Sequence, residues 1–332
     1  MWARVRELVP VRTGLLAIDE TSFPKQGKHS VAVKRQYCGA EGKIANCQVA
    51  VSSVLLADGL TWPLTFELYV PNESTADADR RAEVGLPEGV RFREKWRIAL
   101  AHVRTVLKAG FTLTAVLADA DYGRVAGFRR GLEKLGLPYA VAIPWSFSVW
   151  TSGARTTQTA GGIAAHLPDG DWVRVCWADG TKGDLAARFV ARRVRFAKGR
   201  GERWLLCERS LHDDERKYYV SNAAPTASLD SLVRLARGRW PIEQQYRELK
   251  DELGFDHFEG RKYQGWNHHV VLSAVAFTFL QIERRRAPDD ARPTLPTVRF
   301  WVREIMSLLY VIGNRNLLNL MVSFQRNPPL RR

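Results

Sequence analysis

The order of the apolar segments constrains the fold of this chain more than any other feature of its sequence. Three β-prone segments, residues 14–18, 30–38 and 44–56, follow one another across short turns, which predicts an antiparallel meander. Residues 62–69 either extend that sheet or pack beside it. Apolar residues at helical spacing then precede a further short strand at residues 112–117. A helix that connects a meander to another strand predicts an α/β fold with a mixed sheet covered by helices.

The 332 residues divide into three predicted regions. Residues 1–143 form the first part of the α/β core and end in another strand. Between residues 144 and 225, Gly, Thr, Trp and Arg dominate and short β-prone pieces recur, which indicates a β-rich insertion. Residues 226–332 regain helical periodicity and are expected to complete the core with helices. Their most apolar run, residues 270–282, is too short to cross a bilayer, so we interpret it as a buried core helix.

A strong positive charge narrows the classes of partner. The chain has 50 Lys and Arg residues against 35 Asp and Glu, a formal net charge of +15, and such an excess is typical of proteins that bind nucleic acid. A generally basic bacterial proteome is the alternative explanation. The four cysteines form no Cys-x-x-Cys pair and the N-terminus has no signal-peptide pattern. We therefore expect a reduced, cytoplasmic protein without a disulfide framework.

Two carboxylates end apolar strands at comparable places. Asp19 comes directly after residues 14–18, and Asp119 closes the strand that begins at residue 112. If these strands are neighbours in the sheet, the two side chains come together. Two negative charges at such a short distance are unfavourable unless a cation lies between them. Mg²⁺ prefers oxygen ligands and is the natural occupant. The alternative is that each aspartate is an ordinary turn residue at a strand end.

A third acidic residue lies on a predicted helix near residue 240. Pro241 is suited to the first turn of that helix. Glu243 and Lys250 are seven positions apart, so they differ by only about 20° around the helix axis. A carboxylate and a cation on one face can hold a metal ion and, beyond it, a phosphate. A solvated Glu/Lys surface is the alternative, because other charged residues lie on the same helix.

The predicted insertion carries a charge signature of its own. Eight Lys and Arg residues stand between residues 188 and 209 against two Glu, with aromatic residues interleaved. Basic side chains follow phosphates and aromatic rings stack on unpaired bases, so this segment is a candidate DNA-binding surface. Its candidate contact residues are Arg192, Arg193, Arg195, Lys198 and Trp204. The alternative is an exposed basic hairpin whose aromatic side chains belong to the core.

In its layout the chain resembles the RNase H-like DDE transposases of bacterial insertion sequences, with two strands ending in Asp, a β-rich insertion and then a helix bearing Glu. More narrowly, it is similar to the insertion-sequence-four type and its seven-zero-one branch, a type that carries a spaced Tyr-Arg-Glu-Lys signature. Arg239, Glu243 and Lys250 stand at the spacings of that signature, whereas its Tyr position is Ala236. Three further segments resemble that branch: residues 18–25, 35–39 and 118–123.

The resemblance implies an RNase H-like core and a DNA transposase that cleaves transposon ends and transfers strands into target DNA. The implied catalytic and metal-binding residues are Asp19, Asp119 and Glu243, which would hold two Mg²⁺ ions, with Mn²⁺ as an alternative. The residues implied to contact DNA phosphate near the scissile bond are Arg239 and Lys250. Asp121 competes with Asp119 for the second carboxylate position, and we prefer Asp119 because it follows the strand directly. Two metal ions activate a nucleophile and stabilise the leaving oxygen.

The resemblance also implies the partners. We expect double-stranded DNA, self-association on that DNA, no membrane and no small-molecule substrate, in the bacterial cytoplasm at the nucleoid. Only 18 residues precede Asp19, where relatives place a helical DNA-recognition region, so we expect a truncated copy, a misassigned start or one half of a split element. A non-catalytic DNA-binding remnant and a hydrolytic RNase H-like nuclease are the alternatives to a transposase.

Overall fold

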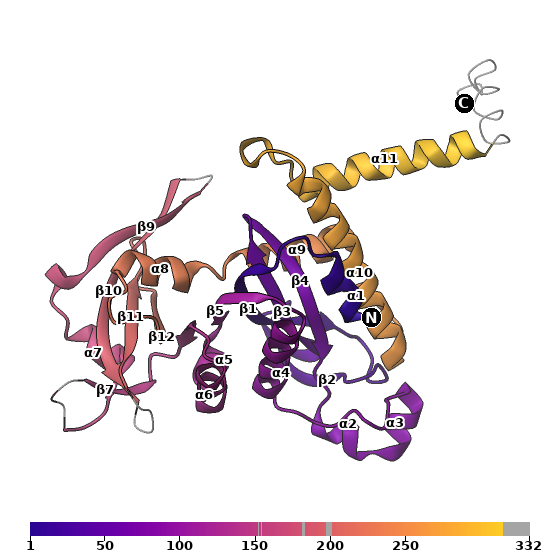
Figure 1. Cartoon of the computed structure of the whole chain (residues 1–332). Coiled ribbons are helices and arrows are strands. Elements are labelled where there is room, and N and C mark those ends of the chain that lie inside the picture. The colour runs from indigo at the N-terminus through magenta and orange to yellow at the C-terminus, as the bar shows by residue number, and fades with distance from the viewer. Residues whose placement is uncertain (152, 154, 181–182, 197–200, 315–332) are drawn as a thin grey trace, which may run out of the picture.

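A twelve-stranded mixed sheet runs through the computed structural model (Figure 1), which describes residues 1–151, 153, 155–180, 183–196 and 201–314. Its first six strands are β1 (Thr13–Pro24), β2 (Lys34–Cys38), β3 (Lys43–Ala57), β4 (Leu60–Leu68), β5 (Thr112–Ala118) and β6 (Tyr139–Ile143). The later strands are β7 (Ser148–Thr151), β8 (Gln158–Thr159), β9 (Val173–Gly180), β10 (Gly183–Arg195), β11 (Arg203–Arg209) and β12 (Arg216–Ser221). Their order is β2-β3-β1-β5-β6-β12-β11-β10-β7-β8, with β4 paired to β3 and β9 paired to β10.

Helices connect and cover these strands. Before β7 they are α1 (Trp2–Leu8), α2 (Asn72–Ala76), α3 (Ala78–Val84), α4 (Lys95–Lys108), α5 (Ala120–Gly123) and α6 (Ala126–Lys134). After β8 they are α7 (Ala160–Ala165), α8 (Leu229–Arg237), α9 (Pro241–Leu253), α10 (Tyr263–Arg285) and α11 (Leu295–Gly313). In Figure 1, α11 leads away from the rest of the chain.

The strand pairing confirms the predicted mixed α/β fold. β1 pairs antiparallel with β3 and parallel with β5, and β5 pairs parallel with β6. β4 pairs with β3, so residues 62–69 extend the sheet rather than pack beside it. A mixed sheet of this kind with helices over it is consistent with an RNase H-like core.

Two strands differ in length from the prediction. β1 continues past Asp19 to Pro24, so the prediction that this strand ends at Asp19 is wrong. The polar residues after Asp19 stay extended because β3 pairs with them, from Asp19 opposite Ser52 to Pro24 opposite Cys47. β2 is shorter than predicted because Ala32 has a positive φ of 56°, which interrupts the extended backbone before the strand begins.

Alternation along β1 divides its side chains between two helical layers. Leu16 and Ile18 belong to a core that includes α4 and α6, whereas Ala17 clusters with Ile242 of α9 on the opposite face. A further core on the α9 side contains α10, the first turns of α11 and Phe66 of β4. The middle of β1 is therefore held between α4 on one face and α9 on the other.

The sheet continues without a break from the core into the predicted insertion. β12 pairs antiparallel with β6, from Tyr218 opposite Ile143 to Ser221 opposite Ala140. β9, β10, β11 and β12 follow as antiparallel neighbours and account for the β-prone pieces of the sequence. The region boundaries at residues 143/144 and 225/226 stay predictions.

The apolar run at residues 270–282 lies within α10. Val270, Ala274 and Phe277 are fully buried, so the interpretation as a core helix is confirmed, while Leu272 and Phe279 on the outer side remain exposed. Over the described part of the chain, every helix falls short of the length or the apolar content that a membrane span requires.

Candidate active site

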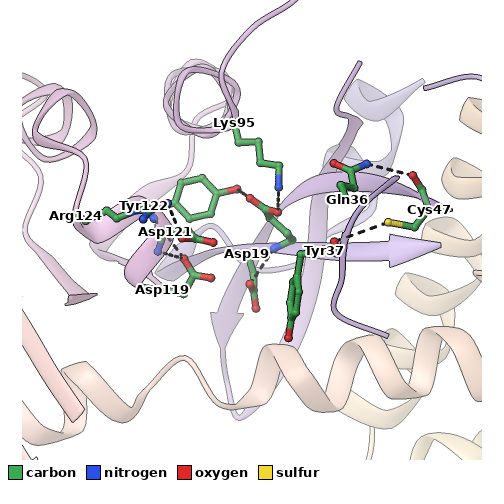
Figure 2. A network of polar contacts seen from close by, with 10 residues as sticks. Asp19, Gln36, Tyr37, Cys47, Lys95, Asp119, Asp121, Tyr122 and Arg124 are labelled. Carbon is green, nitrogen blue, oxygen red and sulfur yellow. Dashed lines mark hydrogen bonds and ion pairs between the residues drawn. The ribbon is translucent and has the colours of Figure 1, made fainter. Parts of the chain in front are cut away.

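Asp19 and Asp119 lie next to each other on two neighbouring parallel strands. β1 pairs with β5 up to Ile18 opposite Ala118, so each aspartate is the next residue along its strand. Figure 2 shows both carboxylates on the same side of these strands. The structure therefore brings together the two aspartates that the sequence singles out.

The residue after Asp19 faces the other layer. Glu20 pairs with Lys95 of α4, and the hydroxyl of Tyr122 donates a hydrogen bond of 3.1 Å to the same carboxylate (Figure 2). The backbone N–H of Glu20 donates to Asp19 Oδ1 at 2.8 Å. Sequence reasoning missed Glu20, Lys95 and Tyr122. The available signal was position, because Glu20 follows Asp19 directly and Tyr122 follows Asp119 by three residues.

The turn after β5 holds Asp119 in place. Its carboxylate caps α5 by accepting hydrogen bonds from the N–H groups of Asp121 at 3.0 Å and Tyr122 at 3.3 Å. The side chain of Asp121 instead lies in solvent and pairs with Arg124 at 3.0 Å. This geometry favours Asp119 over Asp121 as the partner of Asp19.

Arg239 stands between Asp19 and Glu243. One guanidinium nitrogen donates to Asp19 Oδ2, and another lies 3.3 Å from Glu243 Oε1 at the first turn of α9. The side chain of Asp19 is 13% exposed and that of Glu243 is 54% exposed, so the bridge runs from the interior to the surface. Over the residues that the structure describes, no group of three His, Cys, Asp or Glu side chains is close enough to hold a metal ion, and the guanidinium of Arg239 lies between Asp19 and Glu243.

Burial makes these carboxylates difficult to ionise. Burial raises the pKa of Asp19 from 3.8 to about 7, against the opposing effect of Arg239 and with a contribution from Asp119. The pKa of Asp119 is also raised, mainly by burial, and Arg239 again opposes the shift. A divalent cation would favour the charged forms of both groups. The donor set of carboxylate oxygens fits Mg²⁺ or Mn²⁺, provided that the guanidinium of Arg239 moves aside.

The helix α9 lies against the strand that bears Asp19. Lys250, seven residues after Glu243, donates from Nζ to the backbone carbonyl of Ser22 at 3.1 Å, and burial lowers its pKa. Between these two residues, the hydroxyl of Tyr246 lies 2.6 Å from the Oγ of Ser52, the residue paired with Asp19 on β3. Burial, with the charge of Asp19, raises the pKa of Tyr246. One face of α9 therefore carries both signature residues towards β1.

A cavity of about 350 Å³ opens beside the carboxylates. It extends from Glu243 to Ala236, the residue at the Tyr position of the signature. Its basic lining residues are Arg216, Lys217, Arg237 and Arg239. Trp145 and Trp240 also line it and are 67% and 58% exposed. The cavity thus combines positive charge with two accessible aromatic rings.

The three arginines predicted to bind DNA in the insertion have partners within the chain. Arg192 pairs with Asp171. Arg193 and Arg195 both approach Glu202, at 3.4 and 3.5 Å. The side chain of Arg195 is 65% exposed, so its pairing leaves much of it accessible to another anion.

Trp204 also has partners within the predicted insertion. Its ring lies 4.7 Å beneath the guanidinium of Arg193, and its Nε1 donates to the carbonyl of Ala224 at 3.0 Å. Lys198, the remaining predicted contact in this segment, lies outside the described residues.

Two adjacent aspartates on parallel strands, facing a glutamate on a helix, are the arrangement expected of a DDE endonuclease. Residues 1–183 match the model of the family described as DDE superfamily endonuclease, which is more than half of the chain, and the chain belongs to this family. Membership implies a dependence on divalent metal ions.

A comparison with curated proteins narrows the relationship. The chain is 36% identical over 279 residues to the probable transposase for insertion sequence element IS701 of Microchaete diplosiphon. The alignment covers 83% of this chain and 66% of the relative, so the chain spans about two thirds of that protein's length. The resemblance to insertion-sequence DDE proteins is confirmed.

Proposed function

We propose that this chain is the transposase of a bacterial insertion sequence, which cleaves double-stranded DNA at the ends of the element and joins the new ends to target DNA at the nucleoid. The observation that carries the proposal is the pair of contacts that Arg239 makes with Asp19 and Glu243, next to Asp119 at the end of the strand that neighbours Asp19. The similarity to the IS701 relative supports it.

In this proposal the three carboxylates hold two Mg²⁺ ions, or Mn²⁺ in their place, which would activate the attacking oxygen and stabilise the leaving one. With the carboxylates occupied in this way, the guanidinium of Arg239 would be free to bind a DNA phosphate beside them. Lys250 holds a further phosphate from its place two turns along α9. Glu20 forms an ion pair with Lys95 and accepts a hydrogen bond from Tyr122. These contacts fix α5 relative to β1 and so keep the distance between Asp19 and Asp119 constant.

The DNA would lie along the cavity and then along the insertion. The basic lining of the cavity suits phosphates, and the exposed rings of Trp145 and Trp240 suit bases that have left the stack. Farther along the sheet, the proposed contacts are Arg192, Arg193, Arg195, Lys198 and Trp204. The ion-paired arginines among them would exchange a carboxylate of the chain for a phosphate of the DNA.

Cleavage of labelled duplexes that carry the inverted repeats flanking the gene tests the proposal. Asp19→Asn, Asp119→Asn and Glu243→Gln are each expected to lower Mg²⁺-dependent cleavage by at least about a thousandfold, because each removes a metal ligand. Asp121→Asn is the matched control and is expected to retain activity within about threefold, because its carboxylate pairs with Arg124 in solvent.

Incubation of pre-cleaved ends with target DNA distinguishes a transposase from a hydrolytic nuclease and from a non-catalytic DNA-binding remnant. A transposase joins the 3′ ends to the target, whereas a hydrolytic nuclease cuts and never joins. Salt-dependent DNA binding without cleavage in Mg²⁺ or Mn²⁺ would identify a non-catalytic remnant and contradict the proposal.

A further inference from the structure

The helices α4 and α6, which cover one face of the central strands, form a groove between them. They lie side by side (Figure 1), and the groove that both helices line has a volume of about 890 Å³. Five of its lining residues are basic, whereas Glu94 is the acidic one. The basic residues are Arg93, Arg97, Arg104, Arg130 and Lys134. We call this surface the α4/α6 groove.

Three of the five cations in the α4/α6 groove are accessible to an external anion. Arg93 pairs with Glu67, and Arg97 lies 2.8 Å from Glu94. The other three are exposed and, within the part of the chain that the structure describes, have no carboxylate at ion-pair distance. They are Arg104, Arg130 and Lys134. A phosphate can therefore approach these three side chains without first breaking an internal ion pair.

Helical spacing arranges the cations as two stripes along the groove. On α4, Arg97 and Arg104 are seven positions apart, so they differ by about 20° around the helix axis and about 10 Å along it. On α6, Arg130 and Lys134 are four positions apart and differ by about 40°. A DNA duplex carries about six phosphate charges over about 10 Å of its length. The length of the stripes therefore suits a few successive phosphates of a duplex.

Two glycines bring the stripes close together. A Cβ on Gly127 would lie 2.8 Å from the ring of Trp96, and a Cβ on Gly131 would lie 2.4 Å from Leu100 Cδ2. Because both glycines lack a Cβ, α6 packs against α4 more closely than a helix with larger side chains at these positions could. The close packing places the cations of both helices along one groove.

The α4/α6 groove lies on the opposite side of the sheet from the carboxylates. Ile18 of β1 belongs to the core that includes α4 and α6, whereas Asp19, the next residue, points to the other face and contacts Arg239. Arg239 also contacts Glu243 of α9, which packs on that other face. A duplex at the carboxylates therefore occupies a different surface from a duplex in the groove.

We propose that the α4/α6 groove binds the phosphate backbone of a second stretch of duplex DNA, irrespective of its sequence, while the carboxylates face the first. This inference rests on the proposed function in taking DNA as the partner of the chain, but it does not require that the chain cleave DNA. The lining of the groove includes no Ser, Thr, Asn or Gln side chain. Cations without such groups supply affinity for phosphates and little discrimination between bases.

The fluorescence anisotropy of a labelled duplex of random sequence, titrated with the full chain in EDTA at several salt concentrations, tests the proposal. The triple variant Arg104→Gln/Arg130→Gln/Lys134→Gln is expected to lower the affinity for this duplex at least about tenfold. The slope of log affinity against log salt concentration is expected to become shallower by about two to three, because each phosphate contact contributes about 0.9. All three side chains are exposed, so the fold, checked by circular dichroism, should persist.

The matched control is Arg4→Gln/Arg285→Gln/Arg286→Gln, which removes the same charge from exposed arginines of α1 and the end of α10. The control is expected to change the affinity by less than about threefold, because these side chains lie outside the groove. An unchanged affinity and salt slope in the groove variant would overturn the proposal. Equal losses in both variants would also overturn it, because the net charge alone would then explain them.

The outcome of this binding test is separate from that of the cleavage test. EDTA removes the metal ions that cleavage requires, so a chain that never cleaves DNA can still bind a duplex through the α4/α6 groove. Groove-dependent binding by a chain that fails to cleave would contradict the proposed function and support this inference. Cleavage of transposon ends by a chain whose duplex affinity ignores the groove variant would overturn this inference alone.

Discussion

The guanidinium of Arg239 donates a hydrogen bond to the carboxylate of Asp19 across 220 positions of the chain. The same guanidinium reaches Glu243 one helical turn later, so a single side chain neutralises charge contributed by β1 and α9. In the metal-free protein the guanidinium offsets the negative charge of these carboxylates, as a bound cation would. Under the proposed function, metal and Arg239 would therefore compete for the same oxygens.

Replacement of Arg239 tests this competition directly. Arg239→Gln is expected to tighten Mn²⁺ binding by about tenfold in the absence of DNA, because hydrogen bonds to a charged group contribute roughly 1.5–3 kcal/mol and no longer have to be broken. DNA cleavage by the variant should nevertheless fall, since the phosphate loses its guanidinium. Isothermal titration calorimetry measures the affinity. Arg234→Gln, at an exposed ion pair on α8, is the control, and weaker metal binding by Arg239→Gln would refute the idea.

The stability of the metal-free protein is expected to fall between pH 5 and pH 7. The folded chain keeps the Asp19 carboxyl protonated up to a pKa of about 7, whereas the unfolded chain releases the proton near 3.8, so folding takes up a proton in this range. We expect a loss of about 2–3 kcal/mol from this group, measured by urea denaturation in EDTA. Asp19→Asn should remove that slope and Asp121→Asn should keep it. Parallel slopes for all three proteins would count against a buried, protonated Asp19.

Metal binding should show the opposite dependence on pH. At pH 6, one unit below the pKa of about 7, only about one Asp19 carboxylate in ten is ionised. The apparent affinity for Mn²⁺ is therefore expected to be about tenfold lower at pH 6 than at pH 8. Calorimetric titrations at the two pH values measure the difference, and an affinity independent of pH would show that Asp19 is not a ligand.

The turn that carries Asp119 depends on a glycine. A Cβ on Gly123 would overlap the carbonyl oxygen of Ala142 on β6 and lie 3.2 Å from Val141 Cβ, so α5 can approach the sheet only with Gly at this position. Gly123→Ala is expected to lower the free energy of unfolding by about 2–4 kcal/mol, measured by denaturant titration. Gly170→Ala is the control, because a Cβ there meets nothing within 4 Å, and equal stabilities would contradict this account.

Much of the core was predictable because short sequence windows are enough to indicate its strands. The apolar runs that became β3 and β5 and the placement of Asp119 after β5 follow from alternation and turn residues in short windows. The adjacency of Asp19 and Asp119 followed once β1 and β5 were taken as neighbours. Conversely, the extension of β1 through Glu20 to Pro24 was not predictable, because Glu20 and Pro24 are residue types that strands usually lack and the segment is extended by pairing with β3.

The contacts around the site could not be predicted either, because they join residues that lie far apart in the sequence. Lys95 reaches Glu20 from a helix 75 positions away, and no local pattern marks that pair. In the insertion, a count of basic residues could not reveal that Arg192 has a partner in Asp171, which precedes the counted segment by 17 residues. Charge along a sequence predicts an attractive surface, and only the fold shows which cations are already paired.

The pairing of β12 with β6 has a mechanical consequence. Because hydrogen bonds join these strands directly, no flexible tether separates the insertion from the strands that bear the aspartates. A duplex gripped by the far strands would be held at a set span from the carboxylates, so the number of base pairs between the gripped region and the scissile bond would follow from the width of the sheet. Lengthening a loop elsewhere in the chain would leave that number unchanged.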